Sequence, residues 1–229
     1  MLRAVIFDMD GVICDSEPLH LKAFQRVVHE LGILLTDQEY YDRYLAFDDR
    51  GCFRMIFQAN GRPALDEKTL QDLVDRKARY FDEAMKEHLV IYPGAEALIR
   101  KLSTRFALAL ASGARRLEVE YVLRKGKIRG LFTAIVSSDD VQQGKPHPES
   151  FLTALKLLNE RRLVDSPEIK PEECVVIEDS RHGLAAARTA GMKSAAVTTS
   201  YRADQLTDAD LIISSLVGFE IADLEKLFV

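Results

Sequence analysis

The stretch Arg3-Ala4-Val5-Ile6-Phe7-Asp8-Met9-Asp10-Gly11 is central to the fold prediction, because an apolar run stops abruptly at two carboxylates. A run of Ala, Val, Ile and Phe with almost no polar alternation is typical of a strand buried on both faces of a parallel sheet. Ligand sites in open α/β sheets form at the carboxyl ends of such strands, so Asp8 and Asp10 are expected there, with Gly11 allowing the chain to turn. An isolated Asp-x-Asp more often marks an ordinary polar turn. The rest of the chain therefore has to support the site.

Composition limits the classes of function. With 229 residues and 47% hydrophobic content, the chain is long enough for one large domain, or a domain with an insert, around a sizeable core. A net charge of −5 provides no basic field for nucleic acid. No apolar run approaches the ~18 residues of a membrane span, and the chain starts directly in a strand without a leader pattern. The three cysteines form no Cys-x-x-Cys and are expected to be reduced, so we expect a cytoplasmic protein with neither nucleic-acid nor membrane partners.

Hydrophobic periodicity predicts two kinds of structure along the chain. Nothing between residues 17 and 86 has the pattern of a strand, and four segments have apolar residues at helical spacing: 17–31, 37–45, 49–60 and 66–88. Beyond Tyr92, short apolar runs alternate with helical segments. The expected strands are 106–111, 134–136, 174–177, 194–197 and 211–213, and the expected helices are 95–102, 116–125, 148–159 and 181–190.

Strict alternation of strands and helices predicts an α/β fold with a doubly wound, parallel, Rossmann-like sheet. The first strand belongs to this sheet, so an all-helical segment interrupts it. We therefore expect a core domain of residues 1–16 and 87–229 and an inserted helical cap domain of residues 17–86. The charged connection 159–171 is expected to be a surface loop.

Chemically active residues follow four of the predicted strands. The groups are Asp8 and Asp10, then Ser112 and Gly113, then Lys145 in Gly144-Lys145-Pro146, and finally Glu178 and Asp179. Four carboxylates at one edge repel one another unless a cation is present, and Mg²⁺ suits such oxygen ligands. Lys145 and the Ser112 hydroxyl are suited to a phosphoryl group. Ser180 is expected simply to cap the helix that follows it.

The pair Asp8 and Asp10 suggests a division of roles. A carboxylate beside Mg²⁺ can attack phosphorus and form an aspartyl-phosphate, which splits transfer to water into two easier steps. A second carboxylate two residues later can protonate the leaving oxygen and then take a proton from the incoming nucleophile. We assign the first role to Asp8 and the second to Asp10.

The motifs Asp8-Met9-Asp10-Gly11-Val12, Ala111-Ser112-Gly113, Gly144-Lys145-Pro146-His147-Pro148 and Ile177-Glu178-Asp179-Ser180 resemble those of the haloacid dehalogenase (HAD) superfamily, in its order and approximate spacing. The resemblance covers essentially the whole chain. It is most similar to the branch with a C1-type cap that holds β-phosphoglucomutase and phosphoglycolate-phosphatase-like proteins. It implies Asp8 as nucleophile, Asp10 as acid/base, and Ser112 and Lys145 on the phosphoryl group. It implies a metal held by Asp8, the Asp10 carbonyl and Asp179, with Glu178 in or next to its shell.

Candidate substrate-binding residues come partly from the cap. His20 is placed like a hinge-proximal histidine of that branch, Arg50 like part of a substrate-contacting loop, and Lys77 like a cap lysine that reaches the site. Solvated surface charge is the alternative for Lys77, and helix-start acidity explains Asp48 and Asp49. In the core, Arg115 is a candidate for a second anionic group. Gly11 and Gly113 complete the set.

Three functions remain open at this stage. The leading hypothesis is a Mg²⁺-dependent phosphatase acting on a small phosphorylated metabolite, such as a sugar phosphate. The alternative is a β-phosphoglucomutase-type mutase, whose loop pattern around Arg50 is not reproduced. A non-catalytic phospho-acceptor module would not carry a helical insert. We expect a monomer or weak homodimer.

Overall fold

The computed structural model describes residues 1–45, 47–161 and 166–229. The chain divides into two compact units, one of Met1–Asp15 with Val90–Val229 and the other of Ser16–Leu89. These boundaries lie one to three residues from the expected 16/17 and 86/87. Part of the predicted surface loop, residues 162–165, lies outside the described residues. Among the described residues, no helix has the length and apolar character needed to cross a membrane.

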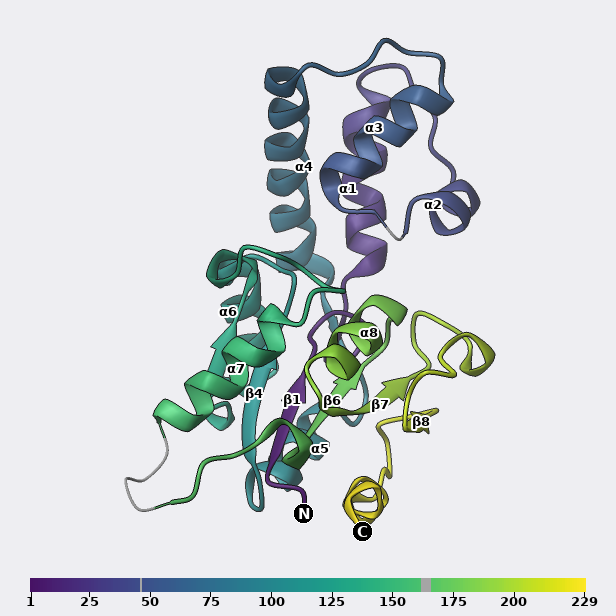
Figure 1. Ribbon diagram of the computed structural model, residues 1–229. Helices are drawn as coiled ribbons and strands as arrows, with labels where there is room; N and C mark the ends of the chain where they lie inside the picture. Colours follow the sequence, from purple (N-terminus) through teal and green to yellow (C-terminus); the bar gives the residue numbers. More distant parts are fainter. Residues whose placement is uncertain (46, 162–165) are drawn as a thin grey trace. The chain divides into compact units, whose positions relative to one another are not determined.

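The first unit is built on a six-stranded parallel sheet with the order β5-β4-β1-β6-β7-β8. Figure 1 labels the strands from β4 to β8 in this order. The strands are β1 (Ala4–Phe7), β4 (Ala107–Ala111), β5 (Ala134–Val136), β6 (Cys174–Glu178), β7 (Lys193–Val197) and β8 (Leu211–Ile213). Successive strands extend the sheet on one side of β1 as far as β5 and on the other side as far as β8. The predicted doubly wound α/β fold is therefore confirmed.

Burial of β1 on both faces follows from its sequence. Ala4 and Ile6 belong to a core cluster with residues of α7 and α8, whereas Val5 and Phe7 point to the opposite face and are equally buried. Period-2 alternation therefore carries apolar side chains into two cores at once. The helices of this unit are α5 (Ala95–Ser103), α6 (Arg116–Lys125), α7 (Glu149–Glu160), α8 (Arg181–Thr189) and the short α9 (Ile221–Glu225).

The second unit contains four helices and, within its described residues, no strand. They are α1 (Glu17–His29), α2 (Asp37–Arg43), α3 (Asp49–Ala59) and α4 (Glu67–His88). Side-chain caps start three of them, because Thr36, Asp48 and Asp66 each accept a hydrogen bond from the backbone N–H three residues later. The expected helix-start role of Asp48 is thus confirmed. Aromatic and aliphatic residues of all four helices form one core.

Two features of the first unit escaped sequence analysis. Cys14–Asp15 (β2) and Val90–Ile91 (β3) form a two-stranded antiparallel ladder in which Asp15 pairs with Val90. Strands of two residues are too short to show an alternating pattern. The C-terminal helix α9 was also not predicted, and at five residues it is shorter than the pattern that identifies a helix. The ladder matters because it joins the two points where the chain leaves and re-enters this unit.

Candidate active site

The end of β1 places Asp8 at the carboxyl edge of the sheet. The Asp8 N–H donates to the Ile177 carbonyl of β6 at 2.9 Å, which continues the ladder one residue beyond the strand. The chain then turns sharply, with the Met9 carbonyl accepting the Ile13 N–H at 2.7 Å. Gly11 has a φ of +75° and packs so closely that a Cβ there would lie 1.8 Å from Asp179 Oδ2. Glycine is required at this position for both its backbone conformation and its lack of a side chain.

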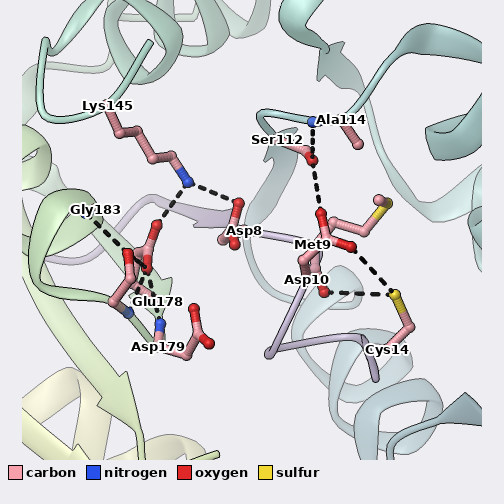
Figure 2. Close-up of polar contacts among 11 residues, drawn as sticks. Asp8, Met9, Asp10, Cys14, Ser112, Ala114, Lys145, Glu178, Asp179 and Gly183 are labelled. Atoms are coloured by element: carbon pink, nitrogen blue, oxygen red, sulfur yellow. Dashed lines mark hydrogen bonds and ion pairs between the residues drawn. The ribbon is translucent and has the colours of Figure 1, made fainter. Parts of the chain in front are cut away.

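Lys145 lies between two buried carboxylates (Figure 2). Its Nζ donates to Asp8 Oδ1 at 2.7 Å and to Glu178 Oε1 at 2.6 Å. Burial alone would lower the lysine pKa, but the charges of Asp8 and Glu178 outweigh it, so the pKa lies above its usual value. The ammonium group therefore stays charged and holds the ends of β1 and β6 together.

Glu178 uses both carboxylate oxygens within the protein. Oε1 accepts from Lys145, and Oε2 accepts the backbone N–H groups of Asp179 and Ser180 at 2.8 Å and the Ser180 hydroxyl at 2.9 Å. Burial opposes ionisation of Glu178, yet the lysine and these hydrogen bonds lower its pKa below the usual value. Ser180 also accepts the Gly183 N–H at 3.0 Å, so its predicted role as the cap of α8 is confirmed.

Three buried acids form a group of suitable size for a metal ion. Asp8, Glu178 and Asp179 each offer a carboxylate oxygen, and these atoms lie within 4.8 Å of one another. Burial, with repulsion from neighbouring carboxylates, raises the pKa of Asp8 to about 7 and holds the pKa of Asp179 well above its usual value. A divalent cation with oxygen preference would offset that repulsion. The donor set therefore fits Mg²⁺, although Glu178 already has hydrogen-bond donors on both oxygens.

Asp10 lies with Ser112 and Cys14 on the other side of this group (Figure 2). The Ser112 hydroxyl donates to Asp10 Oδ2 at 3.4 Å and accepts the Ala114 N–H at 3.0 Å. Cys14 Sγ is 3.9 Å from both Asp10 Oδ1 and the Met9 carbonyl oxygen. Burial, reinforced by nearby carboxylates, raises the pKa of the Cys14 thiol well above its usual value. Cys14 is thus a buried thiol that packs beside the Asp10 turn.

The remaining core candidates follow Ser112. Gly113 is exposed, and a Cβ there would meet only open space. Arg115 makes two hydrogen bonds to Glu118 Oε1, from Nε at 2.7 Å and Nη2 at 2.5 Å, while its backbone N–H donates to Glu118 Oε2 at 2.9 Å. Its side chain remains 41% exposed. Glu118 therefore holds an accessible guanidinium at the start of α6, two residues beyond Gly113.

The candidate residues of the second unit, Ser16–Leu89, make contacts with other residues of the same unit. Lys77 Nζ donates to both Asp49 oxygens at 2.7 and 3.0 Å and lies 2.6 Å from His20 Nδ1. An ammonium group has three N–H donors, so these partners use all of them. The Lys77 side chain is 3% exposed, and the alternative of solvated surface charge is therefore wrong. The ammonium and the His20 ring also both lie against the Phe81 ring.

The Arg50 side chain contacts polar residues of its own unit. Its guanidinium donates to Gln71 at 2.8 Å and forms an ion pair with Glu67. The contacts of His20, Arg50 and Lys77 do not test their roles in substrate binding, which stay predictions.

Several residues that hold the candidate side chains within each unit were missed by sequence analysis. Gly183 lets the Glu178 carboxylate approach, because a Cβ at Gly183 would lie 1.8 Å from Glu178 Oε1. Asp49 and Glu118 are the partners of Lys77 and Arg115. The helical spacing of three residues between Arg115 and Glu118 was visible in the sequence, whereas the approach of Gly183 to Glu178 depends on tertiary structure.

The parallel sheet, the helical insert after β1 and the buried acids around Lys145 form an α/β protein with a candidate metal site at the sheet edge. The chain belongs to the haloacid dehalogenase-like hydrolase family, whose profile matches residues 5–197. The resemblance inferred from the four motifs is therefore confirmed.

Individual relatives support this assignment. The chain is 35% identical to the phosphorylated carbohydrates phosphatase of Thermotoga maritima, over 84% of this chain and 83% of the relative. The crystal structure of β-phosphoglucomutase from Clostridium difficile is similar, with a TM-score of 0.82, 25% identity and coverage of 100% of this chain and 97% of that one. The structure of CbbY from Rhodobacter sphaeroides in complex with phosphate has a TM-score of 0.81 and 26% identity, and covers 98% and 100% of the two chains.

Proposed function

We propose that the protein is a Mg²⁺-dependent phosphatase that hydrolyses a small phosphorylated metabolite, such as a sugar phosphate, through an aspartyl-phosphate intermediate. The observation that carries this proposal is the position of Asp8. Asp8 directly follows the last residue of β1. Its carboxylate, when ionised, can act as a nucleophile, and it lies within a buried group that also contains Lys145 and two further acids. The name of the Thermotoga maritima relative supports the same activity.

The chain's own residues supply both halves of the reaction. In the first, an Asp8 carboxylate oxygen attacks phosphorus, the bond from phosphorus to the ester oxygen breaks, and Asp10 protonates the departing oxygen. In the second, Asp10 takes a proton from water as the water oxygen attacks phosphorus, and the bond to Asp8 breaks to release inorganic phosphate. Lys145 and the Ser112 hydroxyl offset the negative charge on the other phosphoryl oxygens.

We assign the metal ligands to Asp8, Asp179 and the backbone carbonyl of Asp10. When bound, Mg²⁺ would neutralise charge on the phosphoryl oxygens and on the surrounding carboxylates. Glu178 is better suited to a place beside the metal, because its two oxygens already accept hydrogen bonds from Lys145, two backbone N–H groups and Ser180. Its role would be to orient Lys145 and the start of α8.

Substrate selection is assigned to two groups of residues, one in each unit. In the core these are Gly11, Gly113 and Arg115, whose guanidinium is oriented by Glu118. From the insert we retain His20, Arg50 and Lys77. All three side chains contact polar residues of their own unit. Lys77 therefore fits an indirect role, through its contact with His20, better than direct contact with a ligand. The predicted cytoplasmic location and the monomeric or weakly dimeric state stay predictions.

The alternative is a hexose-phosphate mutase, in which phospho-Asp8 passes its phosphoryl group to a second sugar hydroxyl rather than to water. The similarity to the Clostridium difficile structure, named β-phosphoglucomutase, favours keeping this alternative. Both functions use every core residue named above. Membership of a hydrolase family argues against the non-catalytic phospho-acceptor module.

Phosphate release tests the proposal directly. Wild-type protein with Mg²⁺ is expected to release inorganic phosphate from p-nitrophenyl phosphate and from members of a panel of phosphorylated metabolites. Asp8→Asn is nearly isosteric and should lower turnover by roughly 10³-fold or more while leaving the fold intact. Asp204→Asn, a change at an exposed acid, is the matched control.

The outcomes separate the candidate functions. Absence of turnover that depends on Asp8 would contradict both enzyme functions. Glucose bisphosphate formation with interconversion of glucose phosphates, instead of phosphate release, would favour the mutase.

Chelation by EDTA should abolish activity and added Mg²⁺ should restore it, whereas indifference to EDTA would remove the metal from the mechanism.

A further inference from the structure

The loop that follows β7 reaches the turn that carries Asp10 and Gly11. It begins at Thr198, whose backbone N–H donates to the Ile213 carbonyl of β8 at 3.0 Å. Thr199 and Ser200 come next. Both are exposed, and neither is part of the four motifs that identify the family.

Thr199 holds the backbone of Gly11. Its hydroxyl donates to the Gly11 carbonyl oxygen at 2.5 Å. The Gly11 N–H donates to the Cys14 carbonyl at 2.9 Å, which fixes the peptide plane shared with Asp10. The two peptide planes that meet at Gly11 are thus each fixed by a hydrogen bond. The Asp10 carbonyl belongs to the plane held by the Gly11 N–H, and Thr199 holds the plane that follows it.

Ser200 acts on the neighbouring carboxylate. Its hydroxyl lies close to the side chain of Asp179 and acts to lower the pKa of that carboxyl. Both groups border the space left by the absent Gly11 side chain, because a Cβ at Gly11 would lie 1.8 Å from Asp179 Oδ2 and 3.0 Å from Ser200 Oγ. The hydroxyls of two consecutive residues, Thr199 and Ser200, therefore lie against two neighbouring parts of the site, the Gly11 backbone and the Asp179 carboxylate.

We propose that Thr199 and Ser200 are positioning residues for metal binding. Thr199 holds the Gly11 backbone that follows the Asp10 carbonyl, and Ser200 lies against the Asp179 carboxylate. This inference rests on the proposed Mg²⁺ site. Hydrogen bonds to metal-binding groups fix their direction before the ion arrives, and losing one typically weakens metal affinity by about 10- to 100-fold. Because both hydroxyls are exposed and water can replace them in part, we expect the lower end of that range.

Mg²⁺ binding to the full chain, measured by isothermal titration calorimetry, tests this role without any substrate. Ser200→Ala and Thr199→Val should each weaken Mg²⁺ binding by about tenfold. Ser200→Thr and Thr199→Ser retain the hydroxyl and should restore binding to nearly the wild-type value. Thr198→Val is the matched control in the same loop, because the contact between Thr198 and Ile213 uses the backbone N–H.

A second readout distinguishes positioning from general damage. If the hydroxyls act through the metal, the Mg²⁺ concentration that gives half-maximal phosphate release should rise in Ser200→Ala, while kcat at saturating Mg²⁺ stays near wild type. Melting temperatures in EDTA should be little changed.

Three results would count against the proposal. Unchanged Mg²⁺ affinity in folded Ser200→Ala and Thr199→Val overturns it and leaves the proposed function intact. An equal loss in Thr198→Val or in the hydroxyl-retaining variants also overturns it, because a general effect of the loop then explains the data. A wild-type protein that does not bind Mg²⁺ overturns the metal-dependent function and this inference together.

Discussion

At the scale of single residues, the two glycines Gly11 and Gly183 set how closely the acids of the site approach the backbone. Each leaves the space in which a carboxylate lies, Asp179 at Gly11 and Glu178 at Gly183. Gly183 does not have a positive φ, so its requirement is purely steric. A side chain at Gly183 is therefore excluded by the lack of space alone, whereas a side chain at Gly11 would also strain the backbone.

Replacing Gly183 with alanine should displace the Glu178 carboxylate from Lys145. We expect Gly183→Ala to lower the free energy of unfolding by about 1–3 kcal/mol, as overpacking of a tight site does. Gly130→Ala is the control, since a Cβ there meets nothing within 4 Å, and it should change stability by less than about 0.5 kcal/mol. Urea unfolding measures both variants, and an equal effect of the two would show that Glu178 has room to move.

Lys145 is the counterion of two buried acids, so its removal should affect folding as well as turnover. Lys145→Met leaves Asp8 and Glu178 without their shared cation, and we expect a loss of about 3 kcal/mol in metal-free protein. Lys156→Met, at a lysine whose side chain is 75% exposed, should have little effect. Denaturant unfolding in EDTA gives the comparison. Equal stability of the two variants would contradict the structural part of the role.

At the scale of elements, Asp210 fixes the connection between β7 and the edge strand β8. Its carboxylate accepts from Lys193 Nζ at 2.8 Å and from the Ser194 N–H at 2.9 Å. Partial burial opposes its ionisation, but these hydrogen bonds outweigh burial and lower the pKa of Asp210 below its usual value. The short strand β8 thus depends on a charged group at its start.

A lowered pKa in the folded state predicts how Asp210→Asn depends on pH. The ionised group stabilises the fold fully above the unfolded pKa of about 3.9, and this contribution is lost as the pH falls through the lower folded value. We therefore expect Asp210→Asn to cost about 1 kcal/mol at pH 7 and progressively less below about pH 4. Urea unfolding at several pH values measures this, with Asp208→Asn as the exposed control. A difference that grows on acidification would contradict the assignment.

At the scale of the whole molecule, the ladder of β2 and β3 lets the insert be treated as a single loop. Asp15 and Val90 are directly paired, so their Cα atoms lie about 5 Å apart. An Asn-Gly turn can join such a pair as a two-residue hairpin. Replacing residues 16–89 with Asn-Gly should therefore give a folded core.

We expect this shortened chain to show cooperative thermal unfolding by circular dichroism and to bind Mg²⁺ by calorimetry. Because the insert is assigned to substrate selection, the shortened protein should discriminate less among phosphorylated metabolites. An insoluble or non-cooperative product would contradict the independence of the core. Unchanged discrimination would instead contradict the role given to the insert.

Much of this organisation could be predicted because it depends on local patterns. The run from Ala4 to Phe7, the polar residues after each strand and the helical spacing of the insert are all visible in the sequence, and they predicted the sheet, the insert and the acids around Lys145. The paired partners of Lys77 and Arg115 were not predicted, because charged residues on helices are usually solvated. Contacts made by Thr199, Ser200 and Gly183 depend on how distant loops meet, and only the folded chain brings them together.

The pairing of Asp15 with Val90 also bears on how the chain folds. The pairing of β1 with β4 spans the entire insert, and long connections between paired strands make closure slower and entropically more costly. The insert consists of helices with mainly local contacts, and the residues that flank it, Asp15 and Val90, are paired in the ladder. If it forms first, the connection that β1 must close is reduced to residues 8–15 and 90–106, a saving of about 1 kcal/mol in loop-closure entropy. An early helical insert would therefore speed assembly of the sheet.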